Sequence, residues 1–144
     1  MNEVNVLYPI KGFKRIFGCS QFQKEYKDLY RKNKSDALKY EKWLDRQLAF
    51  LDIEDPDTLL VDHPKVFEPV RSFSYEGESL AIYSIRRPEF AKNPRILFTF
   101  VESDTGGLAI LLLAFSELKS HTYDRYIPTA IHRVKDLLSG TEDK

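Results

Sequence analysis

The chain has 144 residues, with 22 Lys and Arg balancing 22 Asp and Glu, so its formal net charge is zero. This length suits a single domain over residues 1–144 without a disulfide or structural metal, and the zero charge argues against nonspecific nucleic-acid binding by the whole surface. The only cysteine is Cys19, so an internal disulfide is excluded. Residues 1–30 hold no apolar leader, and no run approaches the ~20 apolar residues of a membrane-spanning helix. For these three reasons we expect a cytoplasmic protein.

The N-terminal third has the pattern of short strands followed by two helices. Residues 4–17 are mixed, with Val4, Val6 and Tyr8 alternating before Pro9, and they leave open one strand or two strands broken at Pro9 and Gly12. Ser20 suits the N-cap of a first helix, and Ser35 suits that of a second. The two helices over residues 20–51 predict an αα-hairpin whose apolar stripe covers a sheet. The stripe recurs mostly at helical spacing: Phe22, Tyr26, Leu29, Tyr30, Leu38, Trp43, Leu44, Leu48 and Leu51.

The middle of the chain predicts a connection and then a meander of strands. Residues 52–70 are rich in Asp and Pro and predict a long connection with a short turn near 58–61, because proline is excluded from central strands. A short strand can follow at 70–74, and Glu76-Gly77-Glu78 is typical of a turn. Three strands are then predicted at about 79–87, 95–103 and 108–115, paired in sequence order and antiparallel.

Two apolar runs joined by Asp104–Gly107 form the expected centre of this sheet. The second run, Leu108–Phe115, is apolar on both faces, which is typical of a strand covered on both sides. We expect the N-terminal helices over one face and the C-terminal helix, or a segment of a partner, over the other. Strict alternation along the second run predicts one set of Leu108, Ile110 and Leu112 and an opposite set of Ala109, Leu111, Leu113 and Phe115.

The last predicted element is a short C-terminal helix. Thr122 or Asp124 can cap it, Gly140 suits its end, and Pro128 is expected in its first turn, where proline is tolerated. The fold class predicted from these elements is α+β: an N-terminal helical hairpin packed on a small antiparallel meander, with a short C-terminal helix.

The C-terminal half resembles the RelE/HigB superfamily of toxins, and more narrowly the phage-derived Gp49-like branch of HigB type. The resemblance covers about residues 58–138 and implies a RelE-like fold. It rests on the order of a strand ending in basic residues, an Arg-Ile-Leu-Phe-x-Phe strand, an apolar strand ending in Ala-Phe, and a helix. The carrying residues are Tyr83-Ser84-Ile85-Arg86-Arg87, Arg95 to Phe100, Leu111 to Phe115, Lys119, Thr122 and Ala130.

The resemblance implies the toxin of a type II toxin–antitoxin system. Such a toxin is an endoribonuclease that cleaves mRNA, in some cases on the ribosome, without a metal or other cofactor, and a cognate antitoxin of helix-turn-helix type neutralises it. Arg95 would stabilise the phosphate, since its planar fork pairs two oxygens. The resemblance places the other catalytic candidates at Lys119, His121, Tyr123 and Tyr126, and the RNA-binding candidates at Arg86, Arg87 and Lys92.

Plainer roles remain open for these residues. Arg95 could be an exposed arginine at a strand end, Arg86 a solvated strand terminus, and Tyr126 a packing residue of the helix. The chain also departs from the family pattern, because Ser116-Glu117-Leu118-Lys119 brings an acid where two basic residues are usual. Two alternatives therefore stay open: a ParE-like toxin that binds DNA gyrase, or a non-catalytic domain of the same fold.

Overall fold

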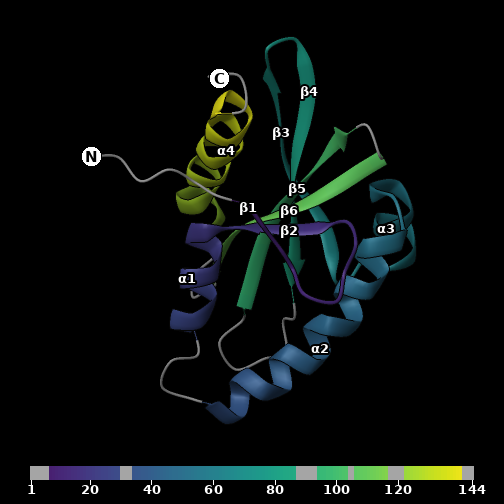
Figure 1. Cartoon of the computed structure of the whole chain (residues 1–144), viewed down its shortest axis with the longest axis vertical. Helices are drawn as coiled ribbons and strands as arrows, with labels where there is room; N and C mark the ends of the chain where they lie inside the picture. The colour runs from purple at the N-terminus through teal and green to yellow at the C-terminus, as the bar shows by residue number, and fades with distance from the viewer. Residues whose placement is uncertain (1–6, 30–33, 87–93, 104–105, 117–121, 141–144) are drawn as a thin grey trace.

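The computed structural model describes residues 7–29, 34–86, 94–103, 106–116 and 122–140, and these form a six-stranded mixed sheet with four helices (Figure 1). Across the sheet the strands lie in the order β1-β2-β6-β5-β4-β3. In chain order the elements are β1 (Leu7–Pro9), β2 (Ile16–Cys19), α1 (Ser20–Leu29), α2 (Lys34–Ile53), α3 (Pro56–Asp62), β3 (Phe67–Tyr75), β4 (Glu78–Arg86), β5 (Pro94–Ser103), β6 (Gly106–Ser116) and α4 (Thr122–Gly140).

The predicted antiparallel meander is present as β4, β5 and β6. Each of these strands pairs antiparallel with the next along the chain. The turn predicted at Glu76-Gly77 joins β3 to β4, and both residues have positive φ, of 51° and 83°. Two successive residues of positive φ match the right-handed twist of the flanking strands, and glycine adopts such a φ without steric cost.

The prediction of a helical hairpin on a small antiparallel sheet was wrong. The sheet has six strands, and β2 lies parallel to β6, with Ile16 opposite Ala109. Helix α1 packs against β6, whereas α2 runs on toward α3, so the two helices diverge (Figure 1). The pairing of β2 with β6 joins segments about 90 residues apart in the chain, and local periodicity carries no signal for such a partner.

The region predicted as a long connection contains a helix and part of an edge strand. Asp55 caps α3, because its carboxylate accepts a hydrogen bond from the Thr58 N–H at 2.8 Å, and Pro56 occupies the first helical position. This bond lowers the pKa of Asp55, as expected for a carboxylate that accepts from a backbone N–H. Pro69 lies in β3 beside a shift in register, and β3 is at the edge of the sheet, where proline is tolerated.

The expectation that both faces of the last strand are covered is confirmed. On one face, Ala109 and Leu111 of β6 pack with Phe22 of α1 and with the apolar side of α2. On the other face, Leu112 and Leu113 pack with α4. The second cover is therefore the chain's own C-terminal helix. The α2 and α4 contributions are Tyr40, Leu44, Leu48 and Leu51 on the first face and Ala130 and Val134 on the second.

A bulge corrects the predicted alternation of β6. Leu97 pairs with Leu113 and Phe98 with Leu111, so Leu112 is an extra residue on β6. As a result Leu112 and Leu113 both join the α4 cluster, together with Ile110 and Phe115. The bulged backbone has its own partners: the Leu112 carbonyl accepts hydrogen bonds from Arg133 Nη1 at 2.7 Å and from Cys19 Sγ at 3.3 Å.

Helix α4 begins earlier than Pro128 suggested. It runs from Thr122 to Gly140, so Pro128 lies inside the helix rather than in its first turn, and its ring is exposed. The apolar side of α4 buries Ile127, Ala130 and Val134. Packing of this side against the sheet outweighs the loss of one backbone hydrogen bond at the proline.

Candidate functional site

Two candidate residues, Arg86 and Arg95, are neighbours at one end of the sheet, on the face that α4 covers. Arg86 at the end of β4 pairs directly with Arg95 of β5, and Arg95 pairs with Phe115 at the end of β6. Paired residues of neighbouring strands project from the same face. This face is that of α4, because Leu97, two residues beyond Arg95, packs in the α4 cluster. We call Arg86, Arg95, Phe115 and Tyr126 the strand-end row.

Arg86 is the accessible cation of the row. Its side chain is 33% exposed, and its Nη1 atom lies 3.7 Å from the Glu68 carboxylate of β3. Its backbone N–H donates to the Val66 carbonyl at 2.9 Å, which ties the end of β4 to the segment before β3. A partly exposed pair at this distance is weak, so Arg86 can exchange its contact with Glu68 for one with another anion.

Arg95 is buried, so the plainer alternative of an exposed arginine at a strand end does not hold. Only 5% of the residue is accessible, and Nη1 donates to the Pro94 carbonyl at 3.3 Å. A guanidinium remains protonated in a protein interior. Its charge therefore contributes to the electrostatic potential at this end of the sheet, while solvent access to the group itself is small.

Tyr126 packs against the sheet and also contacts the side chain of Arg125. Its ring stacks on Phe115 with 4.4 Å between centroids and 22° between planes, which agrees with the packing role left open above. The guanidinium carbon of Arg125 lies 5.6 Å from the centroid of the Tyr126 ring, within cation–π range. Arg125 is exposed and was not among the predicted site residues. Its position directly before Tyr126 in the sequence could have indicated it.

The other predicted residues are not tested by the structure. Arg87, Lys92, Lys119 and His121 lie outside the described residues, and Tyr123 is described only as part of the first turn of α4. Among the described elements, β4 ends, β5 begins and β6 ends at the row.

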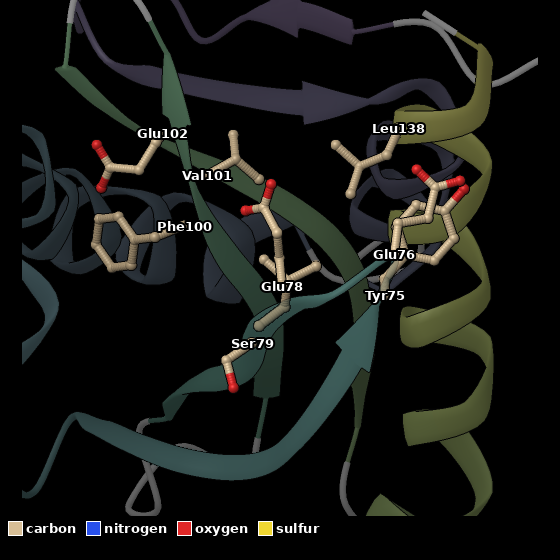
Figure 2. Close-up of a pocket in the computed structure, with 9 residues that line it drawn as sticks. Tyr75, Glu76, Glu78, Ser79, Phe100, Val101, Glu102 and Leu138 are labelled. Carbon is tan, nitrogen blue, oxygen red and sulfur yellow. The ribbon is translucent and has the colours of Figure 1, made fainter. Parts of the chain in front are cut away.

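The opposite end of the sheet holds a hollow of about 400 Å³ with acidic character. Figure 2 shows carboxylates from the β3–β4 turn, the start of β4 and β5, together with apolar side chains that line the floor of the hollow. Carboxylates repel phosphate, so this hollow does not suit an RNA backbone. Among the described residues, no group of three or more His, Cys, Asp or Glu is arranged to hold a metal ion. The acidic residues are Glu76, Glu78 and Glu102, and the floor includes Tyr75, Phe100 and Leu138.

Cys19 is a buried structural thiol, as the sequence predicted for a small apolar residue. Burial raises the pKa of Cys19 above its ordinary value, so the thiol stays protonated at neutral pH. We expect Ellman's reagent to react with the folded protein slowly and with the urea-unfolded protein completely. Because the chain has one cysteine, the absorbance reports this thiol alone. Rapid reaction of the folded protein would contradict the burial of Cys19.

Comparison with known proteins gives no relative, since no protein-family model, no curated protein and no solved structure matches the chain. Within the described ranges, none of the helices combines the length and apolar character that crossing a bilayer requires.

Proposed function

We propose that the protein is an RNA-cleaving toxin of RelE/HigB type that acts at the strand-end row. The observation that carries the proposal is the placement of Arg86 and Arg95 as direct neighbours across β4 and β5, beside the Phe115–Tyr126 stack. Two guanidinium groups at one strand end favour binding of a phosphate, and aromatic and arginine side chains favour stacking of an unpaired base.

The proposed reaction is attack by a ribose 2′-oxygen on the adjacent phosphorus, which breaks the bond from phosphorus to the 5′-oxygen. A base accepts the proton of the 2′-hydroxyl and an acid donates one to the 5′-oxygen, so the products are a 2′,3′-cyclic phosphate and a 5′-hydroxyl. Arg86 and Arg125 are the accessible cations for the charge that grows on phosphate, while Arg95 acts from its buried position. His121, Tyr123 and Tyr126 remain the proposed residues for proton transfer, and Lys119 is proposed as a further basic residue of the site.

The partners that go with this function are also proposals. The substrate is mRNA, free or on the ribosome, and the site of action is the cytoplasm. A cognate antitoxin of helix-turn-helix type neutralises the toxin. A gene for such a protein next to the gene for this chain would support the assignment.

The test compares Arg86→Ala with the matched control Arg46→Ala, an exposed arginine on α2. Each full-length protein is expressed from an inducible promoter, and growth and transcript 5′ ends are recorded. We expect the wild type and Arg46→Ala to arrest growth and produce new 5′ ends, and Arg86→Ala to lower cleavage about 100-fold, because it removes a cation from the transition state. Wild-type cleavage retained in Arg86→Ala would remove the row from the mechanism.

Arg95→Ala is expected to abolish growth arrest as well. Because Arg95 is buried, this variant can lose activity through unfolding, so its urea midpoint is measured beside that of the wild type. Loss of arrest with an unchanged midpoint would support a role for its charge in RNA cleavage.

Two observations favour the second candidate, a protein-binding toxin or a non-catalytic domain. Arg95 is buried, and Arg86 lies near the carboxylate of Glu68. Both arginines therefore have structural roles that do not require RNA. A ParE-like toxin would arrest growth while the 5′ ends of transcripts stay unchanged, and a non-catalytic domain would leave growth unchanged. The same expression experiment therefore separates the three functions.

A further inference from the structure

A second hollow, of about 530 Å³, lies between α1 and α2 on the face of the sheet opposite α4. Its floor is apolar and is made by residues of α1, α2 and β6. Leu44 and Leu48 are one helical turn apart, so they form a continuous stripe along α2. The floor residues are Phe22, Tyr26, Leu44, Leu48 and Leu111, with Ile10 at one end. We call this hollow the α1–α2 groove.

The two walls of the α1–α2 groove carry opposite charges. Lys11 and Lys27 line the side of the β1–β2 turn and α1, whereas Glu41 and Asp45 line the side of α2. All four side chains are exposed, and none has an ion-pair partner among the described residues. Glu41 and Asp45 are four residues apart on one helix face, where like charges repel each other and destabilise a helix. A cation bound between them would relieve that repulsion.

Tyr26 shows that the acidic wall faces the floor of the groove. Burial, together with the carboxylates of Glu41 and Asp45, raises the pKa of the Tyr26 phenol above its ordinary value. The ring also lies near Tyr40 of α2, with 6.2 Å between centroids, so α1 and α2 are in contact at this depth. Tyr26 therefore packs toward α2 while it lines the floor of the groove.

We propose that the α1–α2 groove binds an amphipathic α-helix of a partner protein. The apolar side of that helix would lie over Phe22, Leu44 and Leu48, with acidic side chains toward Lys27 and basic side chains toward Glu41 and Asp45. A helix is about 10–12 Å wide with its side chains, and α1 is ten residues long, so about three turns of the partner fit beside it. Anchors at a spacing of three or four residues match this mode of recognition.

The charges favour a protein helix over other occupants. A nucleic-acid backbone would meet the carboxylates of Glu41 and Asp45, and a lipid with one charged end would leave one wall without a counter-charge. The proposal goes beyond RNA cleavage and does not depend on it, since the groove and the strand-end row lie on opposite faces of the sheet.

The test uses three designed helical peptides with the same Leu stripe. One peptide has Glu along one flank and Lys along the other, the second has Glu on both flanks, and the third has Lys on both. Binding to the full-length protein is measured by fluorescence anisotropy. We expect the mixed peptide to bind at least ten-fold more tightly than either control, because only it complements both walls in one orientation.

Changing the acidic wall to a basic one should reverse the preference. The double variant Glu41→Lys/Asp45→Lys is expected to bind the all-Glu peptide most tightly, and these exposed positions on α2 should not affect folding. The variant Arg86→Ala should bind the mixed peptide as the wild type does, which separates this result from any failure of the nuclease proposal. Equal binding of all three peptides, no binding, or an unchanged preference in the double variant would overturn the proposal.

Discussion

Replacing Arg133 with Met is expected to lower the free energy of unfolding by about 3 kcal/mol. Arg133 Nη2 lies 2.7 Å from Glu25 Oε2, and Nη1 lies 2.9 Å from Oε1 and 2.7 Å from the Leu112 carbonyl. The Arg133 side chain is 11% exposed and that of Glu25 is 27% exposed, so both charges are largely out of water. The substitution would leave the Glu25 carboxylate with no counter-ion and the bulge carbonyl with one fewer donor.

The measurement is urea unfolding of Arg133→Met, with Lys135→Met as the control. Lys135 is exposed on the same helix, and its replacement should change stability by less than about 0.5 kcal/mol. The double variant Glu25→Leu/Arg133→Met removes both charges and should regain part of the loss. A stability change for Arg133→Met as small as that of the control would show that the pair does not hold α1 and α4 to β6.

The pair also bears on the candidate site. Within the described part of the chain, β6 has no strand partner on the β2 side beyond Leu111, because β2 pairs only with residues 109–111. Glu25 of α1 accepts from the Ala114 N–H at 3.3 Å, and Arg133 of α4 donates to the Leu112 carbonyl. Glu25 and Arg133 therefore provide hydrogen-bond partners for the backbone of β6 just before Phe115. By fixing this part of β6, they help to hold Phe115 in place against the ring of Tyr126.

Replacing Phe98 with Ala is expected to destabilise the fold by about 3–5 kcal/mol. Phe98 is 1% exposed at the centre of β5. Its ring stacks on Tyr83 at 5.5 Å and meets Phe67 and Phe100 edge-to-face at 6.1 Å and 5.7 Å. Removal of the ring leaves a cavity between β3, β4 and β5 that neighbouring strands cannot fill without breaking their register.

The control for Phe98→Ala is Val61→Ala on α3, where the side chain is 77% exposed. Urea midpoints and slopes of both variants should be compared with the wild type. We expect the slope to stay constant and only the midpoint of Phe98→Ala to fall. A midpoint close to that of Val61→Ala would mean that β5 is not the centre of the folded core.

Part of the candidate site was predictable from the sequence. The meander predicted Arg86 at the end of one strand and Arg95 at the start of the next, and the register of β4 and β5 makes them direct neighbours. The burial of Arg95 was not predictable, since it depends on how the folded elements pack around the end of β5. The contact of Arg86 with Glu68 was not predictable either, because the part of β3 that holds Glu68 was predicted to be a connection. Asp55-Pro56 was an overlooked signal for α3.

Local patterns along the chain were enough to predict the meander of β4, β5 and β6, the turn at Gly77 and the two-sided cover of β6, because periodicity and turn chemistry act over a few residues. The burial of Cys19 was predicted from its residue type. The parallel pairing of β2 with β6, the bulge at Leu112 and the divergence of α1 from α2 became visible only in the folded structure. Each of them depends on which backbone edge and which apolar face remain without a partner once distant segments have met, and no local pattern contains that information.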